Sequence, residues 1–265
     1  MFNILKSRHR ERVLERSPIR ERVWRRIIDD RPLFDGLTVD ELSRLKDLAT
    51  LFLDEKDVHG AAGQEIDDRV RATIAAQACL PILNLCIEYY KGWVEVIVYP
   101  GEFVPLREQV DEAGVVHQVR HPLAGESWLR GPLILSWDDV ARIGGSGDDE
   151  GAGVNVVIHE FAHKLDMLNG GADGFPPLHA DMRRAAWAEA FLAAFKDFTA
   201  RVRRGHTTSI DPYAAENPAE FFAVLSEVFF AMPARLKDAY PAVYGQLALF
   251  YRQDPIARLP AASGR

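Results

Sequence analysis

Apolar residues recur every three or four positions through much of the first third of the chain, which predicts a series of helices there. Residues 38–41 read Thr-Val-Asp-Glu, the pattern of a capping box, and leucines continue from it at helical period to Phe52. The same criteria predict helices over 19–28, 65–79 and 81–90, with a glycine-containing break at 59–63. The last two of these helices are apolar on most sides, so we expect both in the core.

The middle of the chain changes to short segments rich in β-branched residues. They predict strands over 94–99, 115–120 and 133–137. The segment 144–153 is rich in glycine and aspartate and is predicted to be a loop. Helical patterns then return, over 154–168, 179–204, 218–232 and 241–252. The predicted fold class is α+β and predominantly helical, with a small sheet.

Charge and hydropathy remove several classes of protein from consideration. The net charge is −7, whereas a nucleic-acid-binding protein usually carries a basic surface. Residues 6–31 are dense in arginine but contain interleaved glutamates, so we expect a solvated helix or tail there rather than a nucleic-acid-binding arm. We find no apolar run long enough to span a membrane, and the start of the chain does not have the pattern of a signal peptide. A cytoplasmic location is the expectation.

The segment 156–163, Val-Val-Ile-His-Glu-Phe-Ala-His, contains a His-Glu-x-x-His motif within a predicted helix. Residues four apart lie about 40° apart around a helix axis, so His159 and His163 can bind one metal ion. Glu160 is offset by about 100°, where it can reach a water on the metal rather than the metal itself. The alternative, two core histidines bonded to carbonyl groups, is disfavoured because polar side chains on an apolar helix are costly.

This arrangement predicts a zinc-dependent metallopeptidase with one Zn²⁺ per chain. Zinc accepts imidazole nitrogen ligands, and with a third protein ligand it keeps one position open for water. Glu160 is then the general base that takes the proton of the water and passes it to the leaving amine.

The third metal ligand must come from another segment, because His163 is not followed by the further histidine of three-histidine metallopeptidases. A glutamate from a later helix is expected instead. The candidates are Glu189, Glu216, Glu220 and Glu227. Glu220 and Glu227 are seven residues apart and share one face of the predicted helix 218–232. Glu220 also fits a capping box that starts at Asn217, so spacing alone leaves the choice between Glu220 and Glu227 open.

Several segments resemble the Mlc titration factor A family of zinc peptidases. The resemblance covers nearly the whole chain and is weakest over the first 30 residues. It is carried by Ile-His-Glu-Phe-Ala-His-Lys-Leu-Asp at 158–166, by the segment 211–227, by Tyr-Pro-Gly-Glu-Phe-Val at 99–104, and by the segments 125–128 and 131–137.

The resemblance implies a zincin-type catalytic domain related to that of anthrax lethal factor, preceded by helices. It implies that Glu220 is the third zinc ligand, seven residues after Tyr213, and that Tyr213 donates its phenol to the oxyanion. It further implies aminopeptidase activity on peptides, and binding of a Mlc-like transcriptional repressor of sugar-uptake genes. A binding protein that sequesters the repressor and merely retains a zinc site is the alternative.

Further roles are expectations of the same kind. Asp166, three residues after His163, is a candidate acceptor for an imidazole N–H group, and Glu227 is a second candidate. The strand 133–136 is expected to be the edge strand along which a peptide lies. We expect a basic N-terminal helix or tail over 1–31, a helical subdomain over 32–90 and a zincin-like catalytic domain over 91–265. One continuous unit over 32–265 is the alternative.

Overall fold

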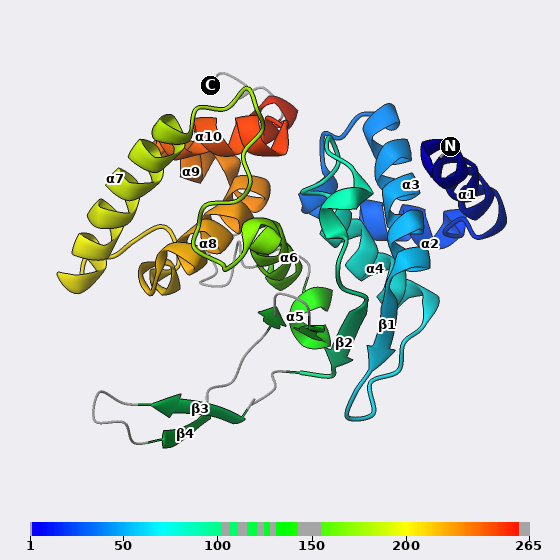
Figure 1. Ribbon diagram of the computed structural model, residues 1–265, viewed down its shortest axis with the longest axis horizontal. Coiled ribbons are helices and arrows are strands. Elements are labelled where there is room, and N and C mark those ends of the chain that lie inside the picture. The colour runs from blue at the N-terminus through cyan, green and yellow to red at the C-terminus, as the bar shows by residue number, and fades with distance from the viewer. Residues whose placement is uncertain are drawn as a thin grey trace.

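The structure is a computed structural model that describes residues 2–101, 106–110, 116–120, 125–127, 131–142 and 155–259. The predicted loop 144–153 lies outside these residues. Within the described part, most residues belong to helices, and the short strands form one four-stranded sheet and one two-stranded ribbon. Figure 1 shows the N-terminal helices and the sheet on one side, helices α7 to α10 on the other, and α6 between them. The expected fold class, α+β and predominantly helical, is confirmed.

The first third of the chain is helical, as its apolar period predicts. Its elements are α1 (Phe2–Arg16), α2 (Glu21–Asp29), the 3₁₀ turn η1 (Pro32–Phe34), α3 (Val39–Glu55) and α4 (Asp68–Cys79). The capping box at the start of α3 is present, because the N–H of Glu41 donates to Oγ1 of Thr38 at 3.2 Å. In return, the N–H of Thr38 donates to Oε2 of Glu41 at 2.9 Å.

The predicted helix over 81–90 is wrong. After α4 this segment forms turns, and its last residues form the 3₁₀ turn η2 (Ile87–Tyr90). Pro81 has no N–H to continue the α4 ladder, and the carbonyl of Leu80 accepts a hydrogen bond from the side chain of Gln253 at 2.8 Å. The segment instead forms turns, in which the N–H of Leu83 donates to the carbonyl of Leu80 at 3.2 Å and the N–H of Leu85 to that of Ile82 at 2.9 Å.

The sheet has the strand order β1–β2–β6–β5. Its strands are β1 (Asp57–Gly60), β2 (Glu95–Tyr99), β5 (Gly125–Ser127) and β6 (Leu133–Ser136). β1, β2 and β6 run parallel, whereas β5 is antiparallel to β6. The expectation that 133–136 is an edge strand is therefore wrong, because β6 pairs on both sides and β5 forms that edge. The ribbon consists of β3 (Leu106–Val110) and β4 (Val116–Arg120).

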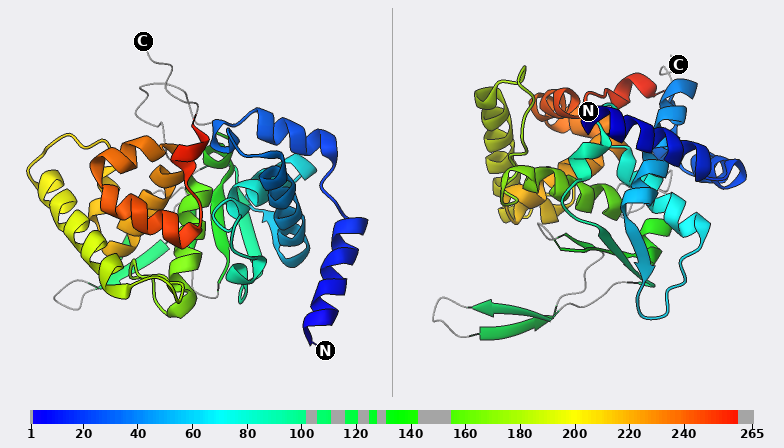
Figure 2. Two further views of the ribbon diagram at one scale, coloured as in Figure 1. Left: turned by 90° about the horizontal axis from the view of Figure 1, so that it is seen from above. Right: turned by 45° about the vertical axis from the view of Figure 1, so that its right-hand side comes forward.

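The C-terminal part is arranged around α8 (Pro218–Ala231), which is buried on nearly every side. It packs against α6 (Val156–Asp166), η4 (Pro212–Ala215), α9 (Pro233–Ala239) and α10 (Pro241–Tyr251). The other elements of this part of the chain are α5 (Trp137–Ala141), η3 (Met167–Asn169), α7 (Arg184–Arg203) and η5 (Pro255–Arg258). The left view of Figure 2 shows the same division, with α7 to α10 on one side and the N-terminal helices on the other. The helix predicted from residue 179 begins only at Arg184, since a turn joins Met182 to His179.

Aromatic side chains fill the space between α7, α8 and α10. Trp187 is fully buried and stacks on Phe191, with ring centroids 4.2 Å apart. It also contacts Phe222 and Phe250, at 6.0 and 5.7 Å between centroids. Burial of one such side chain stabilises the fold by roughly 1.5–3 kcal/mol, so this cluster stabilises the packing of α8 against α7 and α10.

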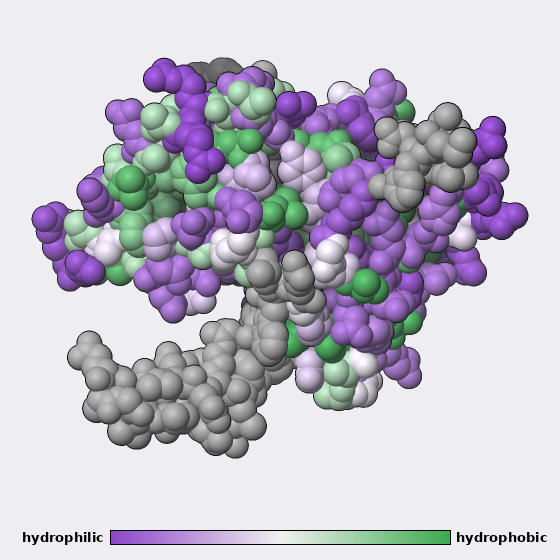
Figure 3. All heavy atoms as spheres, in the orientation of Figure 1, coloured by the Kyte–Doolittle hydropathy of each residue, from purple (hydrophilic) through white to green (hydrophobic). Residues whose placement is uncertain are grey.

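The arginine-rich N-terminal segment finds acidic partners on the helices beneath it. Arg10 pairs with Glu88, and Arg20 lies 3.3 Å from Asp68. These pairs favour the expectation of a solvated, folded helix over a free nucleic-acid-binding arm. The face drawn in Figure 3 is mostly hydrophilic, and its hydrophobic residues lie in small groups. None of the described helices combines the length and the apolar composition needed to cross a membrane.

A glycine sets the distance between the end of α6 and the start of α8. Gly174 has a φ of +77°, and a Cβ atom added there would lie 2.4 Å from the carbonyl oxygen of Pro218. Its N–H donates to Oδ2 of Asp166 at 2.7 Å, and its carbonyl accepts from Nε1 of Trp187 at 3.2 Å. The turn that follows α6 therefore rests directly against the first residue of α8.

Gly174→Ala should lower the free energy of unfolding by about 1–3 kcal/mol, because the added methyl group is strained by positive φ and collides with backbone. Urea unfolding followed by circular dichroism measures the change. Gly171→Ala is the matched control, since a Cβ atom there meets nothing within 4 Å. Equal stability of the two variants would show that the approach to Pro218 is not tight.

Candidate metal centre

Two histidines of α6 point to the same place. The helix begins after Asn155, whose side-chain oxygen accepts a hydrogen bond from the N–H of Ile158 at 2.9 Å. One turn separates His159 from His163, and their ring centroids lie 4.8 Å apart. The two Nε2 atoms are 3.2 Å from each other. The helical spacing predicted from the sequence thus brings two imidazole nitrogens together.

Glu220 joins them from the first turn of α8. The side chain of Asn217 accepts hydrogen bonds from the N–H groups of Ala219 and Glu220, at 2.9 and 3.0 Å, and so caps the helix. The Glu220 carboxylate points to the histidines, with Oε2 at 3.0 Å from Nε2 of His159 and 3.3 Å from Nε2 of His163. Among the described residues these three groups form one cluster, with ligand atoms all within 4.8 Å of one another.

The donor set fits a small divalent metal ion. In a tetrahedral site with bonds of about 2.0–2.1 Å, neighbouring ligand atoms lie roughly 3.3 Å apart, close to the separations of 3.0–3.3 Å within this cluster. Burial by itself raises the pKa of Glu220, but hydrogen bonds and charges of the histidines outweigh it and hold that pKa well below its usual range. The site therefore keeps a carboxylate in its charged form beside two imidazole nitrogens.

Glu227 lies behind His159 rather than beside the other donors. Its Oε1 is 2.5 Å from Nδ1 of His159, and its Oε2 accepts a hydrogen bond from the N–H of Asn155 at 2.7 Å. A carboxylate on Nδ1 favours the tautomer whose Nε2 lone pair faces the metal position. Burial lowers the pKa of His159, but the charge of Glu227 and the hydrogen bonds of Glu220 and Glu227 raise it well above the usual value.

Glu160 is a buried carboxyl group, and few hydrogen bonds offset the cost of removing it from water. Only 4% of the residue is exposed, and its Oε2 atom has no hydrogen-bond partner among the described groups. Burial raises the pKa of Glu160 to about 7, against the lowering effect of the histidine charges. An uncompensated acid in the interior costs stability and is typical of a functional site.

Asp166 is fully buried but does not lie in hydrogen-bond contact with His163. Its Oδ2 accepts the N–H of Gly174, while Asp166 Oδ1 and Nδ1 of His163 are both buried without a hydrogen-bond partner in the described part of the chain. Burial raises the pKa of Asp166 to about 6. The contact with Gly174 gives Asp166 a role in placing the turn against α8.

Tyr213 lies at the rim of the cluster. It belongs to η4, where Asp211 accepts its N–H at 2.8 Å. Its ring centroid is 6.2 Å from that of His159, and 44% of the residue is exposed. The structure therefore brings His159, Glu160, His163, Glu220, Glu227 and Tyr213 into one region, whereas Glu189 and Glu216 are exposed.

Several residues around the site are absent from the sequence predictions. In the sequence, Asn155 follows a segment rich in glycine and aspartate and precedes an apolar one, a signal for an N-cap that could have been recognised. Lys164 is buried, donates to the carbonyl of Gly131 at 3.1 Å and has its Nζ 4.7 Å from the ring centroid of Trp93. Burial lowers the pKa of Lys164 to about 8, against the raising effect of the Glu160 charge. No local pattern marks such a contact.

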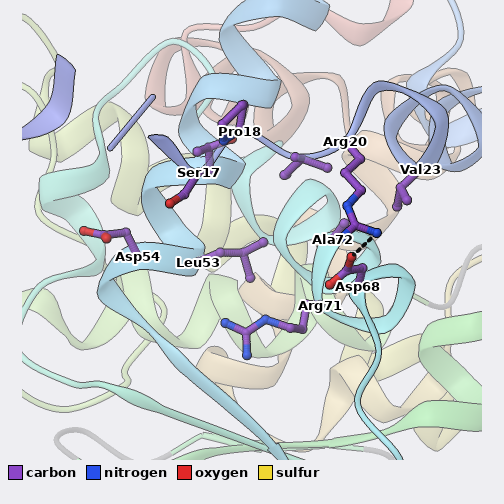
Figure 4. A pocket seen from close by; sticks show the side chains of 11 residues that line it. Ser17, Pro18, Arg20, Val23, Leu53, Asp54, Asp68, Arg71 and Ala72 are labelled. Carbon is purple, nitrogen blue, oxygen red and sulfur yellow. Dashed lines mark ion pairs between the residues drawn. The ribbon is translucent and has the colours of Figure 1, made fainter. Parts of the chain in front are cut away.

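A separate pocket of about 410 Å³ lies between the α1–α2 connection, α3 and α4. Figure 4 shows the Arg20–Asp68 ion pair at one side of it and Leu53 near its middle. It contains none of the predicted site residues, so the chemistry of the cluster on α6 and α8 does not involve it.

Three proteins named Mlc titration factor A are similar to this chain. The one from Salmonella gallinarum is 43% identical over 233 residues, which cover 86% of this chain and 85% of the relative. The one from Escherichia fergusonii is 40% identical over 230 residues, with the same coverage of 86% and 85%. The one from Enterobacter sp. is 39% identical over 235 residues, with coverage of 88% and 87%.

The family model described as glucose-regulated metallo-peptidase M90 matches residues 5–252. This match confirms the resemblance seen in the sequence and agrees with a helical, zincin-like metallopeptidase domain. A metallopeptidase needs a metal ion, and the histidine and glutamate cluster on α6 and α8 offers donors for one. The chain belongs to the M90 family of glucose-regulated metallopeptidases.

Proposed function

We propose that the protein is a zinc-dependent aminopeptidase, with His159, His163 and Glu220 as the ligands of one Zn²⁺ per chain. The observation that carries the proposal is the convergence of these three side chains, whose ligand atoms lie within 4.8 Å of one another. Two nitrogen donors and one carboxylate oxygen form a ligand set of catalytic zinc sites that leaves a position open. When bound, zinc supplies a Lewis acid that activates water and polarises the peptide carbonyl.

Glu160 is the group that moves protons in this proposal. It takes a proton from the attacking water and delivers it to the nitrogen of the leaving amine. Its pKa, raised to about 7 by burial, suits a group that must accept and release a proton at neutral pH. Its unpartnered Oε2 atom supports the role, because no described side chain competes for it.

Tyr213 stabilises the negative charge that develops on the carbonyl oxygen. Its ring lies next to His159 and is 44% exposed, so a substrate can reach it. A phenol placed beside the reacting carbonyl donates most strongly when charge has developed there, which lowers the barrier rather than the ground state.

The peptide substrate lies along β5 in this proposal, not along β6. β5 pairs with β6 on one side and forms the edge of the sheet, and it contacts α6, which carries the histidines. An extended peptide can add to such an edge through backbone hydrogen bonds. β5 thus takes the place of the strand 133–136, which is predicted from the sequence to hold the substrate.

A second role concerns a protein partner. The relatives carry the name Mlc titration factor A at 39–43% identity over most of their length. On that basis we propose that this chain also binds a Mlc-like transcriptional repressor of sugar-uptake genes, which places it in the cytoplasm. A repressor-binding protein with a retained but weakly active zinc site is the alternative.

His159→Ala should abolish stoichiometric zinc binding, because two donors cannot hold the ion as three do. Metal analysis of dialysed protein gives the zinc content of the variant and of the unchanged chain. The matched control is His206→Ala, which removes an exposed histidine and should leave one zinc per chain. Full zinc occupancy in the His159 variant would refute the ligand assignment.

Glu160→Gln should keep zinc and lower the turnover of a chromogenic amino-acid anilide by about 10²–10⁴-fold, the usual contribution of a general base. Repressor binding should persist in this variant. A chelator should remove the activity of the unchanged chain. Undiminished turnover in the variant would exclude Glu160 as the base, and absence of activity in zinc-loaded unchanged chain would favour the binding-protein alternative.

Tyr213→Phe should lower kcat on the same anilide by about 10²–10³-fold with little change in KM, since the proposed oxyanion contact strengthens only as charge develops in the transition state. Zinc content should not change. The control is Tyr240→Phe, which should keep its activity. It removes a hydroxyl that donates a hydrogen bond to Asp197 at 3.0 Å. A Tyr213 variant that differs from this control only in KM would assign the ring to substrate binding instead.

A further inference from the structure

A glutamine on α4 is buried in a mostly apolar part of the core. Gln77 is 3% exposed, and every described neighbour on its helix from Ala72 to Cys79 is buried as well. Its Nε2 group donates to the carbonyl of Val140 at 3.3 Å, and its Oε1 atom accepts from Nδ2 of Asn155 at 2.7 Å. A buried amide that satisfies both its ends marks a specific link between α4, α5 and the start of α6.

Backbone groups at both ends fix the direction of this chain of hydrogen bonds. The side-chain oxygen of Asn155 accepts the N–H of Ile158, so the NH₂ group of Asn155 must face Gln77. The carbonyl of Val140 can only accept, so the NH₂ group of Gln77 must face it. Neither amide can flip without leaving two donors or two acceptors in contact.

The same asparagine reaches the metal cluster through Glu227. The N–H of Asn155 donates to Oε2 of Glu227 at 2.7 Å, and Oε1 of Glu227 lies 2.5 Å from Nδ1 of His159. Both oxygens of this buried carboxylate are therefore occupied. A shift of Asn155 moves the first turn of α6 and the carboxylate that orients the imidazole.

We propose that Gln77 is a positioning residue of the metal centre and acts through Asn155 and Glu227 on His159. This inference rests on the proposed function, in which His159 is a zinc ligand. It extends the site to α4, more than 80 residues before the histidines in sequence, so the N-terminal helices contribute to metal affinity and not only to the fold. Partners that orient a metal-binding histidine usually change affinity by about 10–100-fold when removed.

The test compares zinc dissociation constants, measured by competition with a chromogenic chelator, for Gln77→Met, Asn155→Ser and the double variant. Methionine has nearly the length of glutamine but makes no such hydrogen bonds, and serine still caps α6 while losing the link to Gln77. The matched control is Thr73→Val, one turn earlier on α4, which removes a buried hydroxyl that has no hydrogen-bond partner among the described residues. The visible absorption spectrum of the cobalt-substituted proteins provides a second readout of ligand geometry.

We expect each single variant to bind zinc about 10–100-fold more weakly than Thr73→Val, with a shifted cobalt spectrum. Because both substitutions break the same link, their effects should not add. The zinc dissociation constant of the double variant should be at most about twice that of the single variant that binds zinc less tightly. Zinc affinities within about twofold of Thr73→Val would overturn the proposal, as would losses that multiply in the double variant. If Gln77→Met does not fold, Asn155→Ser decides by the same criterion. Failure of the unchanged chain to bind zinc would instead refute the proposed function.

Discussion

The packing of α6 against α8 brings ionisable side chains of two distant segments into an interior that is otherwise apolar. In such surroundings an isolated charge costs several kcal/mol, so each group either lies near a partner of opposite charge or a metal ion, or has its pKa shifted toward the neutral form, as burial does for Glu160. The contacts of Glu220 and Glu227 with His159 meet this requirement from α8. The site therefore depends on the relative position of these two helices.

Three kinds of contact maintain that position. The aromatic cluster around Trp187 holds α8 from the side of α7 and α10. The turn after α6, tied to Asp166, rests on the first residue of α8 at Gly174. The hydrogen bonds of Asn155 hold the start of α6. Hydrophobic burial supplies most of the stability, whereas the few directed hydrogen bonds determine the register of the two helices.

Local sequence signals predicted what depends on neighbouring residues. The spacing of His159 and His163 and the cap of α3 are properties of single helices, and the structure contains both. The helix predicted over 81–90 is replaced by turns, and the side chain of Gln253 binds the carbonyl of Leu80 at its start, a contact that no local pattern indicates. The pairing partner of β6 on the β5 side was missed for a related reason, since strand order is set by contacts between separate segments.

In the site, too, local sequence signals indicate the features of single helices but not the contacts between distant segments. Spacing alone could not choose between Glu220 and Glu227, because both share one face of α8; the resemblance to a family selected Glu220. The structure separates the two carboxylates by the nitrogen of His159 that each contacts. The link from Asn155 to Gln77 crosses 78 positions of sequence, and a glutamine in an alanine-rich helix gives no sign of a distant partner.

One imidazole ring is held at both of its nitrogens by a single helix, through two glutamates that are seven residues apart. Seven residues of α-helix rise by about 10.5 Å, so the interval from Glu220 to Glu227 fixes the positions of both carboxylates relative to the ring of His159. Insertion or deletion of one residue within it would rotate one carboxylate by about 100° away from the ring. Changes in chain length are therefore not tolerated within these two turns of the helix.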